Sequence, residues 1–352
     1  MGTIEATLQF LNPEGVLAGK PEYLLEDEKV LEAYRLMVLT RHVDARMVTL
    51  QRQGTITFAL SSTGEEACAV GAAFGLMPQD WIYPQYREVG ALFARGFPLE
   101  GFIHNMFCNG LDLNKGRQMP NHFGSKAHNI VTVSSPIATK IPHAAGCAFA
   151  MKLQEEDAVS LCFFGEGATS EGDFHAGLNF AAVLDAPCLF FCRNNRYAIS
   201  TPTSAQFRSD GIYPKAAGYG IEGMRIDGND LFAVYDAVKR ARALKKPVLI
   251  EAMTYRLGAH STSDDPSVYR KSEEVEKAKE FDPLMRLYKY LVSKGLWSED
   301  EEQALLEEVQ QQVTAAIEAA KQAPRPEIET LIEDVYFETP PSLKKQLREV
   351  IP

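Results

Sequence analysis

The chain has 352 residues and is 45% hydrophobic, which provides enough apolar side chains for one large α/β domain or for several smaller ones. Its net charge of −11 disfavours nucleic acid or an anionic membrane as a main partner. The six cysteines lack zinc-ligand spacing, no apolar run is long enough to span a membrane, and the N-terminus shows no signal or transit peptide. We therefore expect a cytoplasmic protein with reduced cysteines.

The first segments of the chain are expected to be structural. Prolines and glycines interrupt any period in residues 1–25 and predict an irregular arm. From residue 27 to 53 apolar side chains recur with a helical period, and Gly54 would end that helix. The small residues after the turn SSTGEE, up to Gly75, predict a tightly packed helix that belongs to the core rather than to a site.

Two polar stretches follow. In WIYPQYREVG, Gln85, Tyr86 and Arg87 come after a proline and open a predicted helical run to Gly96. Taken alone, this stretch fits a core tyrosine beside a surface arginine as well as a pair of site residues. The next stretch, residues 108–126, is rich in Gly, Asn and Pro and predicts a loop, in which His122 fits a site residue or a loop-stabilising residue equally well.

The residues from Ala158 to Asn195 form the most informative unit. The apolar run AVSLCFF predicts a buried strand, which leads directly into Gly165-Glu166-Gly167. A helical pattern follows, and CLFFC then predicts a second buried strand that ends at Asn194-Asn195. Because the carboxyl ends of parallel strands meet at one edge of a sheet, we expect Glu166 and the asparagines to lie close together there.

These residue types indicate a metal-bound diphosphate. A carboxylate, an amide oxygen and a nearby backbone carbonyl suit magnesium, which keeps positions open for water and phosphate oxygens. Arg193, directly before the asparagines, adds a positive charge and a forked donor for phosphate. An ordinary dinucleotide-type turn with an incidental acid is the simpler reading, but GxG followed by a helix, a strand and NN is a more specific pattern.

The later part of the chain continues the alternation of strands and helices. An amphipathic helix over residues 231–244 precedes the buried strand PVLIEA, so we predict an α/β fold with a mainly parallel sheet flanked by helices. Residues 255–269 (YRLGAHSTSDDPSVY) predict a mobile loop, whose polar setting would let His260 titrate near neutral pH. The tail from residue 272 is helical, and Ser298 with Glu301 predicts a capping box.

The sequence resembles a known enzyme family from about residue 28 to 337. GEGATSEGDFHAGLNFAA and FFCRNNRYAISTPTS are similar to the thiamine-diphosphate motif, usually GDG…NN, in the alpha subunits of 2-oxo acid dehydrogenase decarboxylase components. The match is closest to the branched-chain members, since pyruvate-type members usually carry GDGA and a glutamate before NN. The resemblance implies a thiamin diphosphate-binding fold in residues 26–271, preceded by the arm 1–25 and followed by a helical extension, 272–352, packed on the same domain.

The resemblance also implies roles for individual residues. Magnesium would be held by Glu166, Asn195 and the main-chain carbonyl of Tyr197. His260 would be catalytic, lying over the cofactor, where it assists proton transfer or stabilises charge during transfer of the acyl group. Ser261 matches a serine that a kinase phosphorylates in eukaryotic members, so it is a possible regulatory position. The implied cofactor-binding residues are Tyr86, Arg87, Ser135, Ile137, Gly165, Gly167, Ala168, Arg193 and His260.

One position departs from the family pattern. Ser134, Pro136, Thr139 and Lys140 match a potassium site of the branched-chain members, where the last residue is typically glutamine. An ammonium group has about the charge and size of potassium, so we hypothesise that the nitrogen of Lys140 occupies this site and that no ion binds. The alternative is that Lys140 turns to solvent and potassium still binds.

The implied activity is oxidative decarboxylation of branched-chain 2-oxo acids with transfer of the acyl group to a lipoyl-bearing acyltransferase core. The sequence holds one diphosphate-binding domain and lacks the domain whose glutamate activates the cofactor, so the resemblance implies a beta subunit in an alpha2-beta2 assembly. The alternatives are the same chemistry on pyruvate or acetoin, a nicotinamide-dependent dehydrogenase, which GEGATSEG after a late strand fits poorly, and a non-catalytic scaffold.

Overall fold

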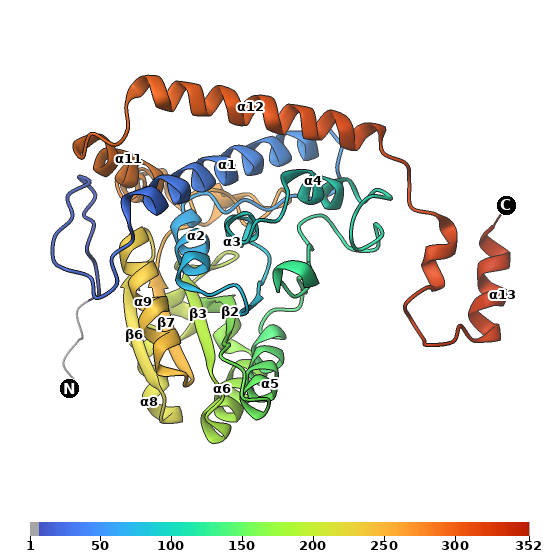
Figure 1. Cartoon of the computed structure of the whole chain (residues 1–352), viewed down its shortest axis with the longest axis horizontal. Coiled ribbons are helices and arrows are strands. Elements are labelled where there is room, and N and C mark those ends of the chain that lie inside the picture. Colours follow the sequence, from blue (N-terminus) through green and yellow to red (C-terminus); the bar gives the residue numbers. More distant parts are fainter. Residues whose placement is uncertain (1–6, 352) are drawn as a thin grey trace.

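A parallel five-stranded sheet forms the centre of the computed structural model, which describes residues 7–351 (Figure 1). Its strands pair in the order β1-β2-β3-β7-β6, and each pair is parallel. The strands of the sheet are β1 (Trp81–Tyr83), β2 (Ser160–Gly165), β3 (Cys188–Asn194), β6 (Glu222–Asp227) and β7 (Val248–Met253), while β4 (Tyr197–Ala198) and β5 (Thr201–Pro202) form a separate antiparallel pair.

Helices cover both faces of the sheet, as the parallel strands require. The helices are α1 (Asp27–Arg52), α2 (Glu66–Gly75), α3 (Val89–Ala94), α4 (Leu99–Phe107), α5 (Lys140–Leu153), α6 (Gly172–Leu184), α7 (Thr203–Gln206), α8 (Ala216–Tyr219), α9 (Leu231–Leu244), α10 (Ser272–Lys279), α11 (Pro283–Ser293), α12 (Glu299–Gln322) and α13 (Pro341–Val350). Short 3-10 turns are η1 (Lys126–His128), η2 (Glu166–Ser170), η3 (Tyr213–Lys215), η4 (Pro266–Val268) and η5 (Ile328–Ile332).

The two central strands divide their side chains between two hydrophobic cores. Leu161 and Phe163 of β2 join a core with helices α1, α2 and α9, whereas Cys162 and Phe164 join a second core with α5 and α6. This alternation is the period-two geometry of a strand, and every residue of β3 is buried. Burial raises the pKa of the Cys188 thiol to about 12, and none of the six cysteines forms a disulfide. None of the described helices could span a membrane.

The N-terminal arm is fixed to the sheet where the structure describes it. Leu8 forms a parallel bridge with Ile226, so it extends the edge of β6. Asp230, the N-cap of α9, accepts hydrogen bonds from the backbone N–H of Phe10 and Leu11. Residues 1–6 of the predicted arm lie outside the described residues.

The C-terminal segment divides into two parts. Helix α12 lies across α1 and α4 (Figure 1), and its buried face, which includes Val309 and Val313, belongs to the main core. Ser298 accepts from the backbone N–H of Glu301, which confirms Ser298 as the N-cap of α12. The carboxylate of Glu301 accepts from the hydroxyl of Ser298 rather than from its backbone N–H, so the reciprocal bond of a capping box differs from the expected one. Helix α13, by contrast, stands apart from the body and buries none of its described residues.

Candidate active site

A cavity of about 350 Å³ opens at the carboxyl ends of β2 and β3. It brings together twelve residues that the sequence predicted for one site, namely Tyr86, Arg87, Ser135, Ile137, Gly165, Glu166, Gly167, Ala168, Arg193, Asn195, Tyr197 and His260. A groove of about 610 Å³ elsewhere on the chain is larger, but it is lined by none of them. Position at the sheet edge, rather than volume, therefore identifies the candidate site.

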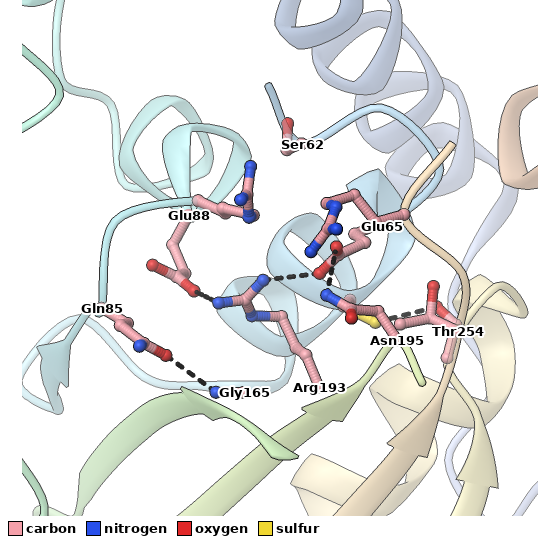
Figure 2. Close-up of polar contacts among 12 residues, drawn as sticks. Ser62, Glu65, Gln85, Glu88, Gly165, Arg193, Asn195 and Thr254 are labelled. Carbon is pink, nitrogen blue, oxygen red and sulfur yellow. Dashed lines mark hydrogen bonds and ion pairs between the residues drawn. The ribbon is translucent and has the colours of Figure 1, made fainter. Parts of the chain in front are cut away.

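The Gly-Glu-Gly turn shapes one wall of the cavity. The backbone N–H of Gly165 donates to Oε1 of Gln85 at 2.7 Å, which fixes the end of β2 (Figure 2). A Cβ atom at Gly167 would lie 2.7 Å from the Cβ of Ala198, so only glycine fits there. A Cβ at Gly165 would meet nothing nearer than Gln85 at 3.9 Å, so this glycine leaves room for a ligand.

The carboxylate of Glu166 has a hydrogen-bond partner at only one of its two oxygens. Its Oε2 accepts the backbone N–H of Asn195 at 3.3 Å, whereas Oε1 is buried without a hydrogen-bond partner. Burial raises the pKa of Glu166 to about 7, because nothing in its surroundings fully replaces the lost hydration of the carboxylate. A buried oxygen without a partner, on a cavity also lined by Asn195 and Tyr197, fits a hard cation.

Within residues 7–351, no cluster of three His, Cys, Asp or Glu side chains could hold a metal ion. The predicted ligand set is not of that type, because it combines one carboxylate with an amide oxygen and a main-chain carbonyl. Oδ1 of Asn195 accepts the N–H of Tyr197 at 3.3 Å, and the carbonyl of Tyr197 accepts from Arg256 at 3.3 Å. Both oxygens retain a second lone pair for a cation.

Three buried arginines line the same cavity. Arg87 donates to the carbonyl of Ser61 and contacts His260, and Arg256 donates to the carbonyls of Tyr197 and Ile199. The Nε atoms of Arg193 and Arg256 are buried without a hydrogen-bond partner. Two buried guanidinium nitrogens without partners, on residues that line one cavity, fit an anionic ligand.

The expectation for Arg193 needs a correction. We expected a fixed positive charge and a forked donor for phosphate, but Nη1 and Nη2 each lie 2.5 Å from a carboxylate, of Glu65 and Glu88 respectively. The two carboxylates therefore occupy the fork, and Nε is the guanidinium nitrogen without a partner. Burial lowers the pKa of Arg193, but Glu88 and Glu65 more than offset this, and the net pKa is raised.

The structure also adds residues that the sequence reasoning missed. Arg256 follows β7 at the same edge of the sheet, so its place after the strand PVLIEA was an available signal. Glu65 was assigned to a core turn, and only its distant partner Arg193 shows its place at the site. His122 both stabilises its loop and lies at the site, the two roles that the sequence left open. Nδ1 binds the carbonyl of Pro120, while Nε2 contacts Ser135 in the cavity.

Two further expectations about the site segments were wrong. Tyr86 and Arg87 precede helix α3, which begins only at Val89, because Glu88 is bound to the N–H of Tyr86 and bends the chain there. His260 does not titrate near neutral pH. Burial first, and then the positive charges of Arg87 and Arg256, lower its pKa to about 3.

This depressed pKa gives a testable pH dependence of stability. The unfolded chain binds a proton at His260 below about pH 6.5, whereas the folded chain does so only near pH 3. His260 therefore makes the free energy of unfolding fall as the pH drops between these values. We expect His260→Gln to lose less stability than the parent between about pH 7.5 and pH 5, measured by urea unfolding. An equal loss in both proteins would contradict this prediction.

The loop that carries His260 is anchored rather than loose. Arg270 donates to the carbonyls of Arg256 and Gly258 and lies within 6 Å of three tyrosine rings, those of Tyr197, Tyr255 and Tyr269. Asp264 accepts from the N–H of His260 at 2.7 Å and from the hydroxyl of Tyr269 at 2.6 Å. These contacts hold the imidazole at the cavity.

Replacing Arg270 with alanine is expected to release this loop. Two hydrogen bonds from a charged donor contribute about 1.5–3 kcal/mol each, so cleavage within residues 257–269 should accelerate at least about tenfold. Limited proteolysis with thermolysin measures this rate. Arg208→Ala, at an exposed arginine in another loop, is the control. Cleavage of both variants at the parent rate would show that Arg270 does not anchor the loop.

The remaining predicted positions lie outside the cavity. Ser134, Pro136, Thr139 and Lys140 occur where the chain enters α5, and burial lowers the pKa of Lys140. Ser261 follows His260 in the anchored loop, where its hydroxyl accepts the N–H of Ser263 at 3.3 Å.

Comparison with known proteins agrees with this geometry. The model of a family described as "Dehydrogenase E1 component" matches residues 34–329. The subunit named "2-oxoisovalerate dehydrogenase subunit alpha, mitochondrial" is 48% identical in Homo sapiens, over 96% of this chain and 81% of that protein. The subunit of the same name in Caenorhabditis elegans is 48% identical over 92% and 77%, and the alpha 1 subunit of Arabidopsis thaliana is 45% identical over 97% and 74%.

These names correct the expected location. Each of these relatives is named as a mitochondrial subunit, which points to a mitochondrial rather than a cytoplasmic protein. The expectation rested on composition and cysteine usage, which do not report the compartment.

Proposed function

The chain belongs to the dehydrogenase E1 component family, and on that premise we propose that it is the alpha subunit of a thiamine-diphosphate-dependent branched-chain 2-oxo acid dehydrogenase. The reaction releases carbon dioxide from the 2-oxo acid and transfers the remaining acyl group to a lipoyl group, whose disulfide is reduced. When bound, thiamine diphosphate supplies the nucleophilic carbon and the electron sink for decarboxylation.

The observation that carries this proposal is Oε1 of Glu166, which is buried without a hydrogen-bond partner at the carboxyl edge of the sheet. Glu166, Oδ1 of Asn195 and the carbonyl of Tyr197 would hold magnesium, and the metal would hold the diphosphate. A buried carboxylate with one oxygen unpartnered is costly in a structural turn, whereas a cation beside that oxygen would remove the cost. A scaffold without cofactor would have no use for this arrangement.

The phosphate end of the cofactor would meet the buried arginines. Arg87, Arg256 and the unpartnered Nε of Arg193 would supply donors, and the open space at Gly165 allows close approach of a ligand. Tyr86, Ser135, Ile137 and Ala168 would line the rest of the bound cofactor.

His260 would act beside the reacting atoms as a neutral imidazole. Its pKa of about 3 keeps it uncharged across physiological pH. Because Nδ1 faces the donors of Arg87 and Arg256, the ring proton lies on Nε2, which can donate a hydrogen bond to the charge that develops during acyl transfer. Arg87 contacts Nδ1 of His260 at 3.2 Å, and the imidazole also meets the ring of Tyr86 edge-on. These contacts hold its orientation over the site.

The cavity wall supports a branched substrate rather than pyruvate or acetoin. Large apolar side chains contribute to the lining of the cavity, namely Phe58, Leu60, Met119, Ile137 and Ile199. Such a surface gains about 0.8 kcal/mol for each buried methylene of a substrate chain, and the relatives are named for 2-oxoisovalerate.

The site is incomplete within this chain. Glu166 is the only carboxylate among the described residues that line the cavity, and it is assigned to the metal. The glutamate that activates the aminopyrimidine ring would then come from a beta subunit, in an alpha2-beta2 assembly. We further propose a lipoyl-bearing acyltransferase core as the acceptor.

The test is decarboxylation by this chain co-expressed with its beta partner, with thiamine diphosphate and magnesium. The rates with 3-methyl-2-oxobutanoate and pyruvate are compared, and the chain without its partner is the control. We expect turnover only with the partner and a preference for the branched acid. Equal or faster turnover of pyruvate would overturn the substrate assignment but keep the cofactor site, and no turnover would overturn the activity.

Two peripheral positions complete the proposal. Lys140 would place its nitrogen where the branched-chain members hold potassium, so activity should not depend on added potassium. Ser261 would be a regulatory position, because a phosphate there would place negative charge beside His260 and Asp264.

A further inference from the structure

Glu65 connects two of the proposed site residues, Arg193 and Asn195 (Figure 2). It ends the turn before α2, and its side chain is buried against the end of β3, at 1% exposure. Oε1 accepts Nδ2 of Asn195 at 2.9 Å, and Oε2 lies 2.5 Å from Nη1 of Arg193. Both oxygens of one carboxylate thus have a definite partner, although Glu65 is not among the residues that line the cavity.

The contact with Asn195 determines which way its amide faces. An amide group carries its acceptor and its donors at opposite ends, whereas an ionised carboxylate can only accept. The carboxylate of Glu65 therefore draws Nδ2 towards itself and turns Oδ1 to the other side. There Oδ1 meets the N–H of Tyr197, and the backbone N–H of Asn195 binds Glu166.

The contact with Arg193 fixes the second group. Nη1 is held by Glu65 and Nη2 by Glu88, whose other oxygen accepts the N–H of Tyr86 at 2.8 Å. With both ends held, the guanidinium plane cannot rotate, and its unpartnered Nε keeps a fixed direction. The buried trio of two carboxylates and one guanidinium also adds a net negative charge next to the proposed metal position.

We propose that Glu65 is a positioning residue that orients the amide of Asn195 so that Oδ1 faces the metal. This inference rests on the proposed function. A glutamine at position 65 would offer one acceptor and one donor. Arg193 can only donate and takes the acceptor, so the donor faces Asn195 and draws Oδ1 away from the metal.

The experiment measures metal affinity directly. The alpha2-beta2 assembly is freed of metal with a chelator and titrated with Mn²⁺, at saturating thiamine diphosphate, while the electron paramagnetic resonance signal of free Mn²⁺ is followed. Glu65→Gln is expected to weaken Mn²⁺ binding about 10- to 100-fold, the usual cost of losing a group that orients a metal ligand.

Glu66→Gln is the matched control. Glu66 is the next residue and equally buried, and its carboxylate is also paired with an arginine, Arg41, at 2.7 Å, but it has no contact with the cavity residues. We expect its Mn²⁺ affinity to stay within about twofold of the parent, although both variants lose a buried ion pair.

A double variant distinguishes a misoriented amide from a general loss of structure. In Glu65→Gln with Asn195→Asp, the glutamine donates to the new carboxylate while still accepting from Arg193, so donor and acceptor are exchanged and Mn²⁺ binding should return. Failure of the pair to recover binding, or an unchanged affinity in Glu65→Gln, would overturn the inference. A parent assembly that binds no Mn²⁺ would instead overturn the proposed metal site itself.

Discussion

Replacing Glu166 with alanine is expected to reduce turnover by the assembled enzyme about a thousandfold or more. The variant removes the only cavity carboxylate and with it the charge that would balance magnesium. Without the metal, the diphosphate of the proposed cofactor would meet three arginines but would lose the anchor that keeps the reactive carbon of the cofactor in place, and a small displacement there is costly. Steady-state decarboxylation of 3-methyl-2-oxobutanoate at saturating cofactor measures the effect.

The control for this variant lies five residues further along the chain. Glu171→Ala removes an exposed carboxylate at the start of α6, outside the cavity, and should leave turnover within about twofold of the parent. If Glu166→Ala kept more than a tenth of the parent rate, the carboxylate would not be the metal ligand, and the raised pKa of Glu166 would reflect burial alone.

Replacing His260 with glutamine is expected to separate the two halves of the reaction. An imidazole N–H that stabilises the charge developing during acyl transfer contributes about 10²- to 10³-fold, so transfer to a lipoyl substrate should fall by about that factor. Decarboxylation followed with a dye oxidant bypasses the lipoyl group and should change less than about tenfold. The ratio of the two rates is the measurement.

Ser263→Ala tests whether any change in the loop has this effect. Ser263 is exposed in the same loop, away from the cavity, and its variant should keep both rates. An equal fall of both rates in His260→Gln would place the imidazole in cofactor binding or decarboxylation. Unchanged acyl transfer would remove His260 from the mechanism.

The grouping of Glu166 and Asn195 at one edge of the sheet was predictable from the sequence, because each residue directly follows or ends an apolar run. Each of the runs that became β2 and β3 is followed at once by its polar residues, Glu166 in one case and Asn195 in the other, and parallel strands must place those ends together. The helix ends were equally predictable from the sequence, since Gly54 and the N-cap Ser298 act within one turn of the helices they end or begin.

The environment of the site was not predictable, because it depends on partners far apart in the chain. Arg193 reads as a free phosphate donor until Glu65 and Glu88 are placed beside it. His260 lies among serines and aspartates in the sequence, but Arg87 and Arg256 surround it in the fold and lower its pKa. Charge compensation is a property of the tertiary structure, and local composition does not report it.

The strand order also determines how this chain can fold. No two neighbours in the sheet are joined by a hairpin; Trp81 of β1 pairs with Ser160, and Leu189 of the central strand pairs with Val248. Each pairing must close a long loop before any contact offsets the lost entropy, which makes folding slow. During synthesis, β3 lacks one of its two neighbours until β7 has left the ribosome. Until then the backbone N–H and C=O groups along one edge of this apolar strand have no partner strand. Growing chains that stop short of Met253 should therefore depend on chaperones to avoid aggregation.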